Sequence, residues 1–123
     1  MLTTTAVAKT LSAIVIACGS NNMIDDYRVC SIGIYSGITQ EVKACEETAK
    51  DTGRDIAQYL ASERLVNTSS LGACVVGGIS QSEADELDAY ARENFGAHQT
   101  ITRYYTVLPS GQPIEGVRMD LEP

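Results

Sequence analysis

The segment YRVCSIGIY, residues 27–35, alternates apolar side chains with small or polar ones at a period of two. Arg28, Cys30, Ile32 and Ile34 form the more apolar set, which predicts a β-strand with this face toward a core and Arg28 at the edge of that face. A second strand rich in β-branched residues is expected within residues 4–17, and GSNN at 19–22 is typical of a turn between the two. Two strands joined by a short turn predict an antiparallel hairpin at the start of the chain.

From Thr39 the apolar period changes to that of an amphipathic helix. Its predicted buried stripe contains Val42, Cys45, Ala49, Thr52 or Gly53, Ile56 and Leu60. A second helix is predicted to start at Ser80, because Glu83 three residues later completes a capping-box pattern. Gly96 suits the residue in left-handed backbone conformation that often ends an α-helix.

The remaining segments have turn or strand character. NTSSLG at 67–72 is expected to be a polar loop, followed by the short buried strand ACVVGGI. HQTITRYYTVL and EGVRMDL flank PSGQP, whose proline and glycine suit the turn of a C-terminal β-hairpin.

This order of elements predicts one α+β domain spanning residues 1–123, because no linker divides the chain. We expect a two-layer arrangement, with a mostly antiparallel sheet, two helices on one face and the C-terminal β-hairpin.

Charge and hydropathy limit the partners. Sixteen acidic and nine basic side chains give a formal net charge of −7, so binding to a nucleic-acid polymer is not expected. No run approaches the ~18 apolar residues of a membrane span, so no membrane partner is expected. A small anionic ligand remains compatible, because arginines in a pocket act locally, within about 10 Å at ordinary salt.

The four cysteines allow two interpretations. Their apolar surroundings favour reduced core thiols in a cytoplasmic protein. Alternatively, VIAC at 15–18 resembles a lipobox, which would make the chain an exported lipoprotein lipidated at Cys18. The preceding segment departs from that pattern, since it carries one lysine, Lys9, a short apolar stretch and many threonines.

Catalytic and metal-binding patterns are weak. His98 is the only histidine, and no local signature places a nucleophile beside it. VVGGIS precedes a helix but matches neither the Walker pattern nor the GxGxxG spacing of phosphate-binding loops. Acidic residues at the same helix start would also repel a phosphate. We therefore expect no enzyme, no catalytic residues, no metal site and no cofactor.

Arginine and aromatic side chains are concentrated near the carboxyl end. Arg103 and Tyr105 share one face of their predicted strand, and Arg118 and Asp120 share a face of the next. Arginine forks suit phosphate, and tyrosine rings offer stacking surface. Cross-strand pairs of the same residues also stabilise sheets without any ligand, so a structural role is the alternative. The predicted ligand-binding set is Arg28, Asn94, Phe95, Arg103, Tyr105, Arg118 and Asp120.

In size, element order and this aromatic–arginine–aspartate set, the chain resembles the Thoeris anti-defence proteins of bacteriophages. The resemblance implies a cytoplasmic, homo-oligomeric sponge that sequesters a cyclic ADP-ribose-type signal without degrading it. We expect such a function, with a small phosphorylated nucleotide as partner and a cationic recess to hold it. The alternatives are an exported lipoprotein and a structural interaction module without a small-molecule ligand.

Overall fold

A computed structural model describes residues 10–21, 27–108 and 110–116. In chain order its elements are β1 (Leu11–Asn21), β2 (Tyr27–Ile38), α1 (Val42–Ser62), β3 (Val66–Val76), α2 (Gln81–Asn94), β4 (Gln99–Val107) and β5 (Pro113–Glu115). The strands form one sheet in the order β3-β1-β2-β4-β5. This confirms the predicted α+β class with two helices.

The sheet is mostly antiparallel, as predicted. β1 pairs antiparallel with both β2 and β3, and β4 pairs antiparallel with β5. β2 and β4 are parallel, and α1, β3 and α2 supply the long crossover connection that a parallel pair requires. The C-terminal hairpin is confirmed in a shorter form, with Tyr105 opposite Glu115 and Val107 opposite Pro113.

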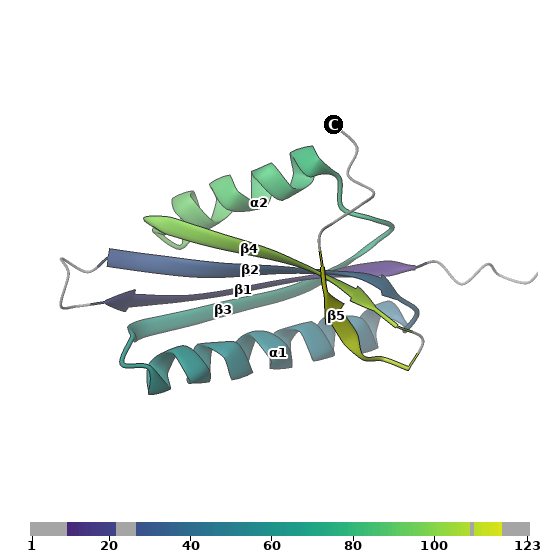
Figure 1. Cartoon of the computed structure of the whole chain (residues 1–123), viewed down its shortest axis with the longest axis horizontal. Coiled ribbons are helices and arrows are strands. Elements are labelled where there is room, and N and C mark those ends of the chain that lie inside the picture. Colours follow the sequence, from purple (N-terminus) through teal and green to yellow (C-terminus); the bar gives the residue numbers. More distant parts are fainter. Residues whose placement is uncertain (1–9, 22–26, 109, 117–123) are drawn as a thin grey trace, which may run out of the picture.

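The two helices lie on opposite faces of the sheet, so the expectation of both on one face is wrong (Figure 1). Alternate β1 residues point to different helices. Val15 belongs to a buried cluster with Cys45 and Ala49 of α1, whereas Ile16 belongs to a second cluster with Ala84 and Ala91 of α2. β1 is buried on both sides, since ten of its 11 residues are buried, and an apolar run of this kind is typical of a strand covered by two layers.

β3 is longer than predicted, and NTSSLG is strand rather than loop. Ser69 and Ser70 lie opposite Cys18 and Ala17 in the β1–β3 ladder. The segment is polar but carries no charge, and pairing with the buried β1 decides its conformation. β1 likewise extends through the expected turn residues Gly19 and Ser20 as far as Asn21.

α1 packs closely on β3 because two glycines lie between them. A Cβ atom added at Gly72 would lie 2.3 Å from the backbone carbon of Ala49, a distance that real Cβ atoms do not adopt. At Gly53, on the helix itself, a Cβ atom would lie 3.3 Å from Cβ of Ser70. A glycine inside a helix costs stability relative to alanine, but Gly53 permits the close packing of α1 on β3.

α2 has the predicted start and end. The Ser80 side chain accepts a hydrogen bond from the Glu83 backbone N–H, and the Glu83 carboxylate accepts one from the Ser80 N–H. Gly96 follows with φ +70°. The Thr100 hydroxyl donates to Asp88 and joins α2 to β4, and this hydrogen bond lowers the pKa of Asp88, with a smaller contribution from Arg92.

Both cysteine pairs form disulfides, which corrects the expectation of reduced thiols. Cys18 of β1 bonds to Cys30 of β2, and Cys45 of α1 bonds to Cys74 of β3. The apolar settings were interpreted correctly, because Cys18, Cys30 and Cys45 are buried, but burial and disulfide bonding are compatible.

This fold and the lipobox interpretation exclude each other. Cleavage before Cys18 would remove residues 11–17 of the strand that pairs on both sides, and acylation would need the sulfur that bonds to Cys30. Neither helix in the described ranges is both long and apolar enough to span a bilayer.

Candidate functional site: a cleft beside the first helix

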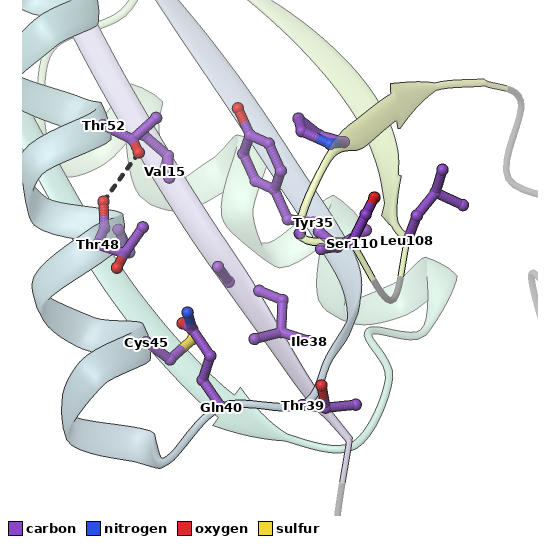
Figure 2. A pocket seen from close by; sticks show the side chains of 15 residues that line it. Val15, Tyr35, Ile38, Thr39, Gln40, Cys45, Thr48, Thr52, Leu108 and Ser110 are labelled. Carbon is purple, nitrogen blue, oxygen red and sulfur yellow. Dashed lines mark hydrogen bonds between the residues drawn. The ribbon is translucent and has the colours of Figure 1, made fainter.

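A cleft of about 480 Å³ opens on the α1 face of the sheet, between α1 and the loop that joins β4 to β5. Figure 2 shows Thr48, Thr52 and Cys45 of α1 on one side and Tyr35, Ile38, Leu108 and Ser110 on the other. Its size falls within the range of small-molecule sites. The cleft is lined by Ala13, Val15, Tyr35, Ile38, Thr39, Gln40, Cys45, Thr48, Ala49, Thr52, Val107, Leu108, Ser110, Gly111 and Pro113.

The floor of the cleft is apolar. Ala13 and Val15 of β1 and Ala49 of α1 are at most 5% exposed, and the Cys45 sulfur is held in the disulfide to Cys74. Small side chains at these positions leave open space between α1 and the β4–β5 hairpin. A ligand that enters would therefore meet hydrocarbon and sulfur rather than polar groups.

Hydroxyl and amide groups surround this floor. Thr39, Gln40, Thr48, Thr52 and Ser110 supply them, together with the Tyr35 hydroxyl. The Thr52 hydroxyl donates to the Thr48 backbone oxygen at 2.8 Å, as the dashed line in Figure 2 shows, so its oxygen still offers acceptor capacity. Among the residues that the structure describes, no residue that lines the cleft carries a formal charge. The cleft thus suits a small neutral molecule with an apolar body and a few hydrogen-bonding groups.

The sheet side of the cleft carries a tyrosine pair. Tyr35 and Tyr105 are direct register partners on the parallel strands β2 and β4. Their rings stack with centroids 4.5 Å apart and planes at 10°. Burial raises the pKa of Tyr35, and the neighbouring Tyr105 raises it further, so the hydroxyl stays a neutral donor at physiological pH.

The wall that faces α1 is a hydrogen-bonded turn between β4 and β5. The Leu108 N–H donates to the Gln112 oxygen at 3.0 Å, and the Gly111 N–H donates to the Leu108 oxygen at 2.7 Å. Gly111 adopts φ +89°, a left-handed conformation that favours glycine. The wall is therefore built by a defined turn on the sheet edge.

The structure separates the predicted site residues between the two faces of the sheet. Arg103 lies opposite Gly33 in the parallel β2–β4 ladder, so it shares the face of Tyr35. Arg28 is an odd number of positions from Gly33 and points to the α2 face, where its Nε reaches the Phe95 oxygen. The expected convergence of these two arginines in one recess is therefore wrong. Strand alternation in β2, together with the register of β2 and β4, places them on opposite faces.

Arg28 acts as a structural connector. Its guanidinium donates to the oxygens of Phe95 at 2.5 Å, Ser20 at 2.9 Å, Asn67 at 2.8 Å and Ser69 at 2.8 Å. Ser20 lies in β1, Asn67 and Ser69 lie in β3, and Phe95 follows α2, so this one β2 side chain joins the ends of several elements. Four protein acceptors occupy the group, which leaves little capacity for a phosphate.

Asn94 and Phe95 also have protein partners on the α2 face. The Asn94 amide donates to the Tyr90 oxygen at 3.1 Å. Phe95 packs against the α2-side core and meets the Tyr90 ring edge-on, with centroids 5.9 Å apart. Both residues help to end α2 at the sheet. Arg118 and Asp120 lie outside the described residues.

His98 also has a structural role, because its polar groups bond to the Arg28 backbone and its ring stacks on Tyr27. Its ring Nδ1 accepts from the Arg28 backbone N–H at 2.9 Å, and the His98 backbone N–H donates to the Arg28 backbone oxygen at 2.8 Å. Its ring stacks on Tyr27 with centroids 5.3 Å apart.

Two of the predicted residues, Arg103 and Tyr105, lie on the cleft face. The Arg103 Nε is 3.5 Å from a Glu115 carboxylate oxygen across the β4–β5 pair. The lining threonines of α1 were not among the predicted site residues. Thr48 and Thr52 are four residues apart, next to the apolar stripe, and such a hydroxyl pair beside a buried stripe was the available signal.

Comparisons with known proteins returned no matching family model, no matching curated protein and no matching solved structure. The class that the fold and site define is a disulfide-bonded α+β domain with a neutral cleft on one face of its sheet.

Proposed function

We propose that this protein binds a small neutral molecule, with an apolar ring or chain and a few hydroxyl or amide groups, in the cleft beside α1. The observation that carries the proposal is the combination of a 480 Å³ cleft, an apolar floor and a rim of neutral hydrogen-bonding groups. Burying apolar ligand surface supplies affinity at about 25 cal/mol per Å². The rim groups then orient the ligand.

The residues that line the cleft support binding of a ligand without its chemical conversion. A general acid or base needs a pKa near the working pH, and the lining hydroxyls and amides do not titrate there. Cys45 is in a disulfide, so it offers no thiolate. Recovery of the ligand unchanged after incubation would support a binding protein, and a converted product would overturn this part of the proposal.

The more specific prediction, a phage sponge for a cyclic ADP-ribose-type signal, is a second proposal. Arg103 and the Tyr35–Tyr105 stack favour it, because they give the cleft face one cation and an aromatic surface. Against it, the described lining residues are uncharged and Arg28 is directed to the other face. Incubation with cyclic ADP-ribose followed by heat release tests it. Unchanged nucleotide in the eluate, lost in Arg103→Ala, is the expected result.

The two disulfides are relevant to the cellular compartment in which the protein is located. Disulfides persist mainly in oxidising environments, which supports export of this protein in place of the expected cytoplasmic location. Thiol counting on denatured protein taken directly from its native cell tests this. No free thiols supports an oxidising compartment, and four free thiols supports the cytoplasm.

A cavity-filling variant tests the cleft itself. The protein is incubated with extract from its native cell, washed and heated, and the released compounds are identified by mass spectrometry. Thr48→Phe places a ring in the cleft and is expected to abolish recovery of the bound compound. Glu47→Phe adds the same ring at the neighbouring exposed position, which does not line the cleft, and is expected to retain it. Equal recovery by both variants would contradict the proposal.

A further inference from the structure

The start of β3 carries an acceptor tripeptide for sugar attachment, formed by Asn67, Thr68 and Ser69. In the pattern Asn-X-Ser or Asn-X-Thr, where X is not proline, the asparagine amide receives an oligosaccharide. The other asparagines of the chain have no serine or threonine two residues later: Asn21, Asn22 and Asn94. A tripeptide alone is a weak signal, so the fold must also present the asparagine.

The fold does expose this asparagine. Asn67 is the one exposed residue between Val66 and Cys74, and all the others in that range are partly buried. An N-linked oligosaccharide is bulky and hydrophilic, so the residue that carries it must lie at the surface. Asn67 meets this condition, whereas its neighbours in β3 do not.

The backbone at Asn67 departs from the regular ladder. Ser69 lies opposite Cys18 and Val66 lies opposite Ser20, so β3 has one more residue than β1 in this interval. Such a bulge redirects a side chain, and it lies here on a strand at the edge of the sheet. Asn67 has φ +53°, a left-handed conformation that asparagine tolerates. Aspartate and glycine also tolerate it, so this conformation alone does not require the acceptor tripeptide.

The two disulfides supply the matching compartment. N-linked sugars are found on surface segments of secreted proteins, and disulfides persist mainly in oxidising environments such as the secretory lumen. The tripeptide and the disulfides are separate features of the chain, and both favour export.

We propose that Asn67 is a modification site that carries an N-linked oligosaccharide. In the transfer, Nδ2 of Asn67 forms a bond to the anomeric carbon of an oligosaccharide carried by a lipid diphosphate. The bond between that carbon and the phosphate oxygen breaks, the lipid diphosphate leaves, and the amide nitrogen loses one proton. The step needs neither an oxidant nor a reductant.

Arg28 determines when the transfer can occur. Its guanidinium donates to the Asn67 backbone oxygen and to the Ser69 hydroxyl oxygen, each at 2.8 Å. In the folded chain the hydroxyl that the acceptor tripeptide requires is therefore bonded to Arg28, and the segment is held against β1. The sugar is added before β3 pairs with β1, and the folded protein then keeps it in solvent.

This proposal goes beyond ligand binding. None of the three tripeptide residues is among the described residues that line the cleft. β3 also begins at the end of the sheet opposite the β5 hairpin (Figure 1), so a sugar there leaves the cleft open. The proposal rests on the proposed oxidising compartment, which the count of free thiols tests separately.

The test uses the protein isolated from its native cell. The protein is reduced, alkylated and treated with peptide N-glycosidase in heavy-oxygen water, which removes the sugar and converts the modified asparagine to labelled aspartate. Trypsin then separates residues 65–92, which contain Asn67, from residues 93–103, which contain Asn94. Label is expected in the first peptide and not in the second. Asn94 is the matched control, because it is exposed but lacks the hydroxyl two residues later.

Three variants made in the same cell test the individual groups. Asn67→Asp tolerates the left-handed backbone and is expected to lose the sugar. Ser69→Ala is expected to lose it as well, whereas Ser69→Thr keeps a hydroxyl and is expected to retain it.

Peptide mapping of the unmodified sequence decides the proposal even if a variant fails to fold. Unlabelled Asn67, or a sugar that Ser69→Ala retains in full, would overturn it. Unlabelled Asn67 in a protein without free thiols would overturn this proposal alone, and four free thiols would overturn the proposed compartment as well.

Discussion

Tyr35 and Tyr105 stack face to face across the parallel strands β2 and β4, with ring centroids 4.5 Å apart. The pair joins the centre of the sheet to the strand that carries the hairpin wall of the cleft. Tyr35 therefore has two roles, since it supports β4 and presents its hydroxyl to the cleft.

Titration of the tyrosines tests this position. Burial and the proximity of Tyr105 both raise the pKa of Tyr35 above its ordinary value of 10.0. Because the folded-state pKa is the higher one, the associated stability is fully present below pH 10 and is lost as the pH rises through the folded-state pKa. Absorbance titration of the phenolates should show a component above pH 10. Tyr35→Phe should remove it, and Tyr105→Phe should shift it downward; persistence of the component in Tyr35→Phe would contradict the assignment.

Arg28 is predicted to contribute to stability and not to ligand binding. Arg28→Ala leaves the oxygens of Phe95, Ser20, Asn67 and Ser69 without this donor and should cost about 2–3 kcal/mol in the free energy of unfolding. Arg28→Lys should recover part of that loss, because an ammonium lacks the planar fork. Urea denaturation measures both. Arg54→Ala, which removes an exposed ion pair with Asp51, is the control and should change stability by less than about 0.5 kcal/mol.

Gly72 is predicted to be the least replaceable glycine in the described chain. Gly72→Ala would place Cβ 2.3 Å from the Ala49 backbone, so α1 must move away from β3. Overpacking of this kind should cost about 3 kcal/mol or prevent folding. Gly78→Ala is the control, since nothing lies within 4 Å of its added Cβ. Thermal unfolding compares the two variants, and equal stability would contradict the close approach of α1 to β3.

The Cys45–Cys74 disulfide should stabilise the cleft as well as the fold. It closes a loop of sequence separation 29, for which chain-entropy arguments give about 3–4 kcal/mol. Cys45→Ala with Cys74→Ala should lower the free energy of unfolding by that order, as denaturant titration would show. No change in stability would indicate that the bond does not form in the native protein.

Sequence reasoning predicted what local patterns determine. The alternation around Ile32 and Ile34, the capping box at Ser80 and the left-handed Gly96 were all predicted from a few neighbouring residues, and the structure confirms them. It failed where distant segments decide the outcome. NTSSLG is a strand because β1 pairs with it, and the helices cover opposite faces because β1 is apolar on both.

The candidate site shows the same limit. Arg28 and Arg103 have similar chemistry, and sequence reasoning grouped them together. Only the register of β2 and β4, with Gly33 opposite Arg103, shows that the two arginines point in opposite directions. The cleft itself depends on the separation between α1 and the β4–β5 loop, which no segment of the sequence determines alone.

The most direct test of the central claim is an NMR titration of the isotope-labelled chain, with indole as a neutral aromatic probe and cyclic ADP-ribose as an anionic one. The account predicts that indole shifts the backbone amides of Ala49, Thr52 and Gly111, that Thr48→Phe abolishes these shifts, and that Glu47→Phe retains them. Absence of shifts at the cleft, or shifts of equal size in Thr48→Phe, would contradict the claim that this cleft is a binding site for neutral molecules.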